Sequence, residues 1–244
     1  MILPADDPDV VAAVEAIRSG DVAKLQRLLS ERPELATAAI GSDHECGVTR
    51  TLLHVVTDWP GHFPNGPQTV AVLVAAGADV NARFTGPHTE TPLHWAASSD
   101  DVAVLDALIE AGADIEARGA VIGGGTPMAD ATAFGNWTSA RRLLQCGAAT
   151  TMWEAAAVGL ADRVEQFFAA ETSLPAEDVT GAFWGACHGG HLGVAQYLVE
   201  RGADVNWVGW DDLTPLDAAE RSEAVAVVAW LRSLRAVSSV RDPK

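Results

Sequence analysis

The chain has 244 residues, of which 48% are hydrophobic, and 16 basic residues against 33 acidic ones give it a formal net charge of −17. A surface this acidic argues against binding to nucleic-acid backbones or anionic membranes, which select patches of lysine and arginine. The hydrophobic fraction and the interspersed charges also argue against disorder, so we expect a folded chain.

The N-terminal residues show no targeting segment. They contain neither a basic region nor a hydrophobic stretch, so a signal peptide is not predicted. The longest apolar run, residues 70–76, is far too short to cross a bilayer. We therefore predict a cytoplasmic protein, and the scarcity of lysine, which occurs only at Lys24 and Lys244, suits a GC-rich bacterial genome.

In chain order, the first predicted structure is a pair of helices that begins near residue 7. Asp7 is a suitable N-cap, and Pro8 suits the first helical position, where no backbone donor is needed. The second helix is expected to end before Pro33. Apolar residues recur at helical spacing in both, namely Val11, Val14 and Ile17 in the first helix and Leu25, Leu28 and Leu29 in the second.

Two short phrases then recur along the chain. The pair Gly-Ala begins at residues 77, 112, 147 and 202, with two gaps of 35 residues and one of 55, which fits one shortened unit plus one complete unit. Thr-Pro-Leu or a variant of it begins at residues 91, 126 and 214, with a degenerate copy at residue 51. Recurrence at a period of about 33 residues predicts a repeat protein of roughly seven units.

The recurring phrase resembles a known repeat. Residues 91–97, Thr-Pro-Leu-His-Trp-Ala-Ala, followed by Gly-Ala-Asp at residues 112–114, are similar to an ankyrin repeat. The resemblance implies an all-α fold, an α-solenoid of about seven stacked helix-turn-helix repeats with short β-turn fingers. We expect a single domain over residues 1–244, with a C-terminal cap as its last unit and a tail at residues 236–244. The units are expected to start near residues 7, 49, 90, 125, 150, 179 and 213.

The resemblance also suggests roles for the residues after the Thr-Pro-Leu phrase. The histidine of the motif usually has a structural role in this family, so we interpret His54 and His94 as scaffold residues. The next position tends to face the concave groove. Along the chain that row is expected to contain Val55, Trp95, Asp130, Ala155, Gly185 and Ala218.

The second unit carries an insertion at residues 58–67, whose prolines and glycines forbid a continuous helix. Such a loop keeps its shape only if Trp59 and Phe63 find a surface to cover. It could form a wall or lid over the groove beside Trp95, or it could pack on its own repeat. A second loop, residues 119–125, ends in three glycines, but no Lys-Ser/Thr follows it, so we predict no nucleotide site and no cofactor there.

Metal and disulfide sites are not predicted. The cysteines Cys46, Cys146 and Cys187 show no CxxC spacing. Residues 43–46 (Asp-His-Glu-Cys) are consecutive, and consecutive loop residues rarely converge on one ion. The helical spacing of His54, Asp58 and His62 loses its meaning because Pro60 and Gly61 break the helix.

Eight tryptophans against one tyrosine are the most unusual feature of the composition. Trp153 and Trp184 are expected at core or inner-helix positions, whereas Trp207 and Trp210 fall in the last long finger, beside two aspartates. Tryptophan is enriched at interface hot spots and can stack on cations. On a chain this acidic, the tryptophans favour a basic or cationic partner.

The leading hypothesis for function follows from the resemblance, because ankyrin repeats act overwhelmingly through protein–protein recognition. We expect a binding protein without enzymatic activity, whose concave face meets a basic or cationic protein partner, and we expect no nucleic-acid or membrane partner. The candidate binding residues are Asp58, Trp59, Trp95, Ser98, Asp130, Phe134, His188, Trp207 and Trp210.

A second hypothesis, from another functional class, is that the groove is a small-molecule site or an active site. Trp59, Trp95 and Trp184 would line such a pocket. Asp130 or His62 would move a proton, with Asp58 as a further candidate. The sequence leaves both hypotheses open.

Overall fold

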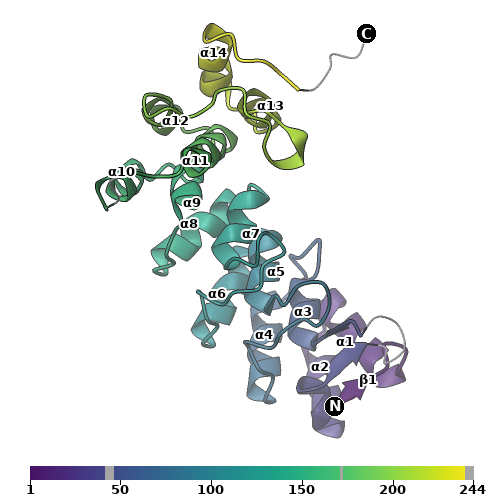
Figure 1. Cartoon of the computed structure of the whole chain (residues 1–244). Helices are drawn as coiled ribbons and strands as arrows, with labels where there is room; N and C mark the ends of the chain where they lie inside the picture. Colours follow the sequence, from purple (N-terminus) through teal and green to yellow (C-terminus); the bar gives the residue numbers. More distant parts are fainter. Residues whose placement is uncertain (42–46, 171–172, 240–244) are drawn as a thin grey trace, which may run out of the picture. The chain divides into compact units, whose positions relative to one another are not determined.

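The computed structural model describes residues 1–41, 47–170 and 173–239 (Figure 1). The chain divides into two compact units, Met1–Ala148 and Ala149–Lys244, which are described one at a time. The single domain expected from the sequence stays a prediction. Residues 43–46 and the last five residues of the expected tail lie outside the described residues.

The first unit contains four successive helix pairs. The first helices of the pairs pack on one another in chain order, and so do the second helices, which gives two layers. The pairs are α1 (Pro8–Ser19) with α2 (Val22–Glu31), α3 (Leu52–Thr57) with α4 (Gly66–Ala75), α5 (Pro92–Ser98) with α6 (Val102–Glu110), and α7 (Pro127–Ala133) with α8 (Trp137–Gln145).

A small sheet, which the sequence did not predict, lies at the start of the first unit. It has the order β1 (Ile2–Leu3), β2 (Ala39–Gly41), β3 (Thr49–Arg50), with β1 parallel and β3 antiparallel to β2. A 3₁₀ helix, η1 (Pro33–Ala36), follows α2 and leads into β2.

The second unit contains three helix pairs with the same two-layer packing. Its core is formed by fully buried alanine, valine, leucine and phenylalanine side chains, among them Phe183. The pairs are α9 (Met152–Ala157) with α10 (Ala161–Ala170), α11 (Ala176–His188) with α12 (Leu192–Val199), and α13 (Pro215–Arg221) with α14 (Val225–Ser233). A short 3₁₀ helix, η2 (Trp210–Asp212), lies in the finger before α13.

The motif residues begin and end these helices for the reasons expected from their chemistry. Threonine occupies the N-cap position of α5, α7 and α13, with a capping box in α5 and α13, and proline follows it at the first helical position. In the Gly-Ala pairs, the glycines adopt the left-handed conformation just after the second helices, with φ between 93° and 98°. The expected all-α fold of stacked helix pairs is therefore confirmed, with four pairs in the first unit and three in the second among the described residues.

The predicted boundaries of the repeats stay predictions, and the sixth helix pair begins before the start expected for its repeat. Its first helix begins at Ala176, three residues before the predicted start, because Pro175 occupies the N-cap position and two acidic residues favour the first turn.

The motif histidines His54 and His94 are completely buried. Nδ1 of each accepts the backbone N–H of its own N-cap threonine, at 3.2 and 3.1 Å. Nε2 of each approaches a carbonyl of the next repeat. For His54 this is the carbonyl of Glu90 at 3.2 Å, and for His94 it is that of Gly125 at 3.4 Å. Burial lowers the pKa of both imidazoles to about 4, so both are neutral at pH 7. This geometry matches the scaffold role predicted for them.

Across the described ranges, no helix is both long and apolar enough to span a bilayer.

Candidate functional site

The first unit has a groove with a cavity volume of about 240 Å³. We call it the Trp95 groove. It lies where the insertion after α3, the α5 helix and the end of α7 come together. Its lining consists of Thr57, Asp58, Trp59, His88, Glu90, Trp95, Ser98, Ser99, Val121 and Phe134.

The insertion forms one wall of the Trp95 groove and is hydrogen-bonded to the repeats before and after its own. The side-chain amide of Asn65 donates to the carbonyl of Gly20, 2.9 Å away. The backbone N–H of His62 donates to Oδ2 of Asp101 at 2.7 Å, and Nε2 of His62 lies 3.0 Å from the carbonyl of Ser99. These bonds fix the loop while Trp59 keeps 82% of its surface exposed. The loop therefore holds a bare indole at the edge of the groove.

A buried carboxylate forms the polar floor of the groove. Glu90 is only 4% exposed, and its Oε2 accepts the indole N–H of Trp95 at 2.9 Å. Nδ1 of His88 lies 2.6 Å from the same oxygen, an ion pair when the imidazole is protonated. Phe84 stacks on His88, with ring centroids 4.9 Å apart, and also contacts Trp95. Trp95 is thus held by both a hydrogen bond and ring contacts.

Asp130, from α7, is fully buried and does not line the groove. Its carboxyl lies against Glu90 and against the backbone of Ile122. Burial, and next the negative charge of Glu90, raise the pKa of Asp130 to about 9. At neutral pH this carboxyl is therefore protonated, a state that suits a proton donor and not a base.

The other acid–base candidates are occupied by structural contacts. Oδ2 of Asp58 pairs with Arg50 at 2.7 Å and with Arg18 at 3.7 Å, so its charge is largely compensated. His62 lies outside the groove lining and is engaged by Ser99 and Asp101.

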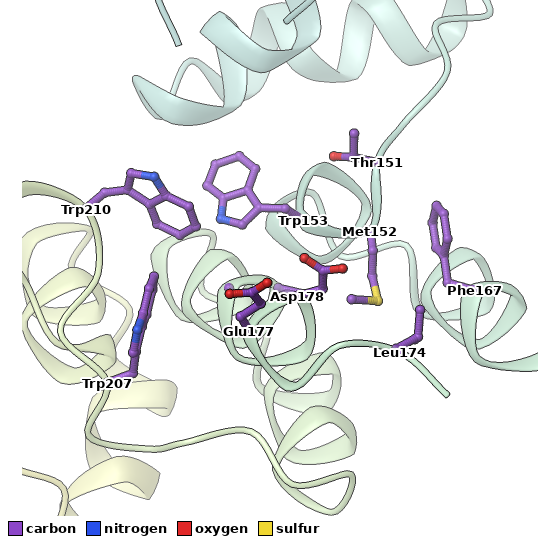
Figure 2. A pocket seen from close by; sticks show the side chains of 11 residues that line it. Thr151, Met152, Trp153, Phe167, Leu174, Glu177, Asp178, Trp207 and Trp210 are labelled. Atoms are coloured by element: carbon purple, nitrogen blue, oxygen red, sulfur yellow. The ribbon is translucent and has the colours of Figure 1, made fainter. Parts of the chain in front are cut away.

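The second unit has a larger pocket, of about 510 Å³, which we call the Trp153 pocket (Figure 2). The start of α9, the helix α10, the first turns of α11 and the finger before α13 contribute to it. Its lining consists of Thr151, Met152, Trp153, Phe167, Leu174, Glu177, Asp178, Gly181, Ala182, Trp207 and Trp210.

Tryptophans form one side of the Trp153 pocket. Trp210 meets Trp153 and Trp207 edge to face, with centroids 5.5 and 5.3 Å apart and interplanar angles of 72° and 79°. Beneath them Trp184, 2% exposed, meets Trp210 at 5.1 Å and donates its indole N–H to the carbonyl of Leu213 at 2.9 Å. This buried residue fixes the finger that carries the two outer rings.

Two glycines of α11, Gly181 and Gly185, lie beside the tryptophans of the pocket. A Cβ at Gly185 would come within 3.1 Å of both the indole nitrogen and the backbone oxygen of Trp153. A Cβ at Gly181 would meet Trp210 at 3.4 Å, which is ordinary van der Waals contact. Glycine inside a helix costs about 1 kcal/mol relative to alanine, so only Gly185 has a steric reason to be retained.

We expect Gly181→Ala to be the more stable of two matched variants. It gains helix propensity without a clash, whereas Gly185→Ala must push the backbone of α9 or the Trp153 ring aside. Chemical unfolding should give a difference of about 1 kcal/mol in the free energy of unfolding. Near-UV circular dichroism should change in Gly185→Ala alone. Equal stabilities and unchanged spectra in both variants would contradict this account.

The residues predicted from the sequence are divided between these two sites. Five of them line the Trp95 groove, namely Asp58, Trp59, Trp95, Ser98 and Phe134, and two, Trp207 and Trp210, line the Trp153 pocket. His188 lines neither. It is buried at the end of α11, with Nδ1 3.0 Å from the hydroxyl of Ser222, and its ring contacts Trp184.

Sequence reasoning missed Glu90 as the groove floor and Glu177 and Asp178 as pocket residues. Trp153, expected at a core or inner-helix position, is a half-buried residue of α9, the first helix of its pair, and its place in a pocket was not predicted. The glycines at 181 and 185, inside an otherwise helical stretch, were the available signal.

Comparison with known proteins agrees with the fold. The family model of the ankyrin repeat matches residues 88–120 and 182–210. A curated relative, an ankyrin repeat and KH domain-containing protein of Caenorhabditis briggsae, is 32% identical over 174 residues, which are 68% of this chain. The chain spans only 6% of that relative's length. Together with the seven helix pairs and their threonine and glycine caps, these matches show that the chain belongs to the ankyrin-repeat family.

Proposed function

We propose that this chain binds a basic segment of a protein partner and anchors an apolar side chain of that segment in the Trp95 groove. Ankyrin repeats are generally protein-interaction modules, which makes a protein the first partner to consider. The observation that carries the proposal is the gathering of exposed apolar side chains around one groove. Trp59 is 82%, Phe134 52% and Val121 48% exposed.

Such a surface is unfavourable unless a partner covers it. Large apolar side chains that cluster at a rim and leave a pocket between them are typical of protein interfaces, and tryptophan is the residue most enriched at their hot spots. The floor is already ordered, because Glu90 and the surrounding rings hold Trp95. Little conformational freedom is therefore lost when an apolar group enters.

Charge supports a basic partner. The net charge of −17 creates a field that attracts cationic segments and speeds their encounter, an effect that salt weakens. Within the groove itself, however, arginines pair with Asp58, and the indole of Trp95 satisfies Glu90. The groove therefore suits an apolar anchor, and the surrounding acidic surface suits the flanking basic residues.

The structure gives less support to catalysis in this groove. The carboxyl of Asp130 lies outside the lining, and the candidates Asp58 and His62 are held in structural contacts. None of the three presents a free base to a ligand.

The test is a selection from a random peptide library displayed on phage, followed by affinity measurements on the selected peptides. Selected sequences should combine several Lys or Arg residues with one large apolar residue, and their affinity should fall as salt rises. The double variant Trp59→Ala/Phe134→Ala should bind at least about tenfold more weakly. Its free energy of unfolding should be unchanged, because both side chains are largely exposed.

Val225→Ala provides the matched control. Val225 is an apolar residue of α14 with 78% of its surface exposed, and it lines neither site. Its replacement should leave binding unaltered. Peptides that lack basic residues, or that bind the double variant as well as the parent chain, would overturn the proposal.

A further inference from the structure

We propose that the Trp153 pocket is a second, independent binding site, and that it takes an N-alkylated ammonium group such as a quaternary ammonium or a methylated lysine side chain. The pocket lies entirely within the second unit and shares no residue with the Trp95 groove. The inference therefore does not rest on the function proposed for that groove.

The walls have the chemistry that recognises such a cation. Trp153, Trp207 and Trp210 line the same pocket, and the edge-to-face contacts of Trp210 with the other two turn neighbouring ring faces in different directions. The face of an indole attracts a cation through its quadrupole, more strongly than the other aromatic rings do. Rings set at steep angles can surround a roughly spherical group, which a flat stack cannot do.

Carboxylates supply the charge. Glu177 and Asp178 come from the first turn of α11 and enter the pocket beside Trp153, as Figure 2 shows. Within residues 1–41, 47–170 and 173–239, neither of them has an ion-pair partner.

The arginines near the pocket pair with other groups than these two carboxylates. Arg221 pairs with Asp211 at 2.6 Å. Arg163 lies over the ring of Phe167, a lining residue, 4.7 Å from its centroid, and donates to Gln166 at 3.1 Å. The two carboxylates therefore remain available to an incoming cation.

The apolar part of the pocket favours an alkylated ammonium over a bare one. Met152, Leu174 and Ala182 present carbon and sulfur surface that cannot replace the water around a –NH₃⁺ group, which needs three acceptors. An N-alkylated cation is weakly hydrated and presents methyl groups to the same surface. The cavity of about 510 Å³ is also larger than a single ammonium needs.

The pocket is also built to keep this shape. Trp184 holds the finger through the carbonyl of Leu213, and the glycine at 185 lets Trp153 lie directly against α11. These supports lie beneath the rings, so Trp210, which is 45% exposed, can be replaced without opening the core.

The test is isothermal titration of the full chain with choline chloride and with 3,3-dimethyl-1-butanol, which has the same shape but no charge. We expect choline to bind at least about tenfold more tightly than the neutral compound. Trp210→Ala and the isosteric double variant Glu177→Gln/Asp178→Asn should each weaken choline binding by about fivefold or more. Trp59→Ala, the matched tryptophan variant in the other unit, should leave it unchanged.

Four results would overturn the proposal. They are binding of neither choline nor a trimethyllysine peptide, equal binding of the neutral compound and choline, choline binding that survives both pocket variants, and equal binding of the trimethyllysine peptide and its unmethylated counterpart. A peptide with one trimethyllysine and its unmethylated counterpart identify the source of the cation. Tighter binding of the methylated peptide than of choline assigns the site to a modified protein partner. Tighter binding of choline assigns it to a free small molecule, and equal binding of the two peptides would exclude selection for an alkylated group.

Because the two sites share no residue, their tests are separable. If the parent chain binds the selected peptides at the Trp95 groove but binds no alkylated ammonium, only the present inference is refuted. The reverse result refutes only the proposed function.

Discussion

Asp130→Asn is expected to stabilise the chain at pH 8 by more than about 2 kcal/mol in the free energy of unfolding. The carboxyl of Asp130 is fully buried and lies against Glu90. Burial and the charge of Glu90 raise its pKa from 3.8 to about 9. An asparagine side chain has nearly the same shape and cannot ionise.

The sign of the pH dependence follows from proton binding. Between pH 4 and pH 9 the folded chain keeps the Asp130 proton and the unfolded chain has released it. Folding must therefore take up a proton, and stability falls with rising pH by up to about 1.4 kcal/mol per unit over this window. Urea unfolding of parent and variant at pH 5, 6.5 and 8 should show the gap widening as pH rises.

Asp101→Asn is the matched control. Asp101 is also buried, but its carboxylate accepts backbone N–H groups of His62 and Val104, at 2.7 and 3.2 Å. Its replacement should destabilise the chain, because one acceptor oxygen becomes a donor that faces a donor. A constant gap between Asp130→Asn and the parent at all three pH values would show that Asp130 is ionised in the folded state.

The second large effect is expected on the acid side, from His54 and His94. Burial lowers the pKa of each from 6.5 to about 4, so the folded state binds fewer protons than the unfolded state between these values. The stability that depends on both histidines being neutral is fully present above pH 6.5 and is lost as pH falls towards 4. At that point each histidine has lowered the free energy of unfolding by up to about 3 kcal/mol.

His94→Gln separates this titration from the general effect of acid. Glutamine can still accept the N-cap N–H of Thr91, but it does not titrate, and it loses the contact with the Gly125 carbonyl. The variant should be less stable than the parent at pH 7.5 and should lose less stability on going to pH 4.5. Unfolding curves at both pH values measure this difference, and parallel losses in the two proteins would exclude His94 as an acid-sensitive group.

The parts of the fold that were predicted correctly are those that depend on local chemistry. A threonine before proline and a glycine after a second helix act within one turn, so their positions in the sequence give the helix boundaries directly. The first helix of the sixth repeat begins earlier than expected, at Ala176, because Pro175 stands at its N-cap position where other repeats have threonine.

The sites depend on contacts between repeats, which the sequence does not show. Asp130 stands at a position expected to face the groove, yet it is buried, and the backbone of Ile122 from the preceding loop lies against it. Likewise, the sequence places Trp153 on an inner helix but does not show that the finger with Trp207 and Trp210 lies beside it and forms a pocket. The groove was predicted better, because five of the nine candidate residues line it.

The composition of the Trp153 pocket limits how this array can change in evolution. Solenoids readily gain or lose a repeat at an end, since each unit interacts mainly with its neighbours. Here, however, Trp153 belongs to the fifth repeat, Gly181 to the sixth, and Trp210 to the finger that leads into the seventh. Deleting any one of these repeats would remove a part of the pocket, and inserting a repeat between them would separate its parts. The pocket can therefore be inherited only as a block of consecutive repeats, and related arrays that carry it should keep the spacing between these residues even where their repeat number differs.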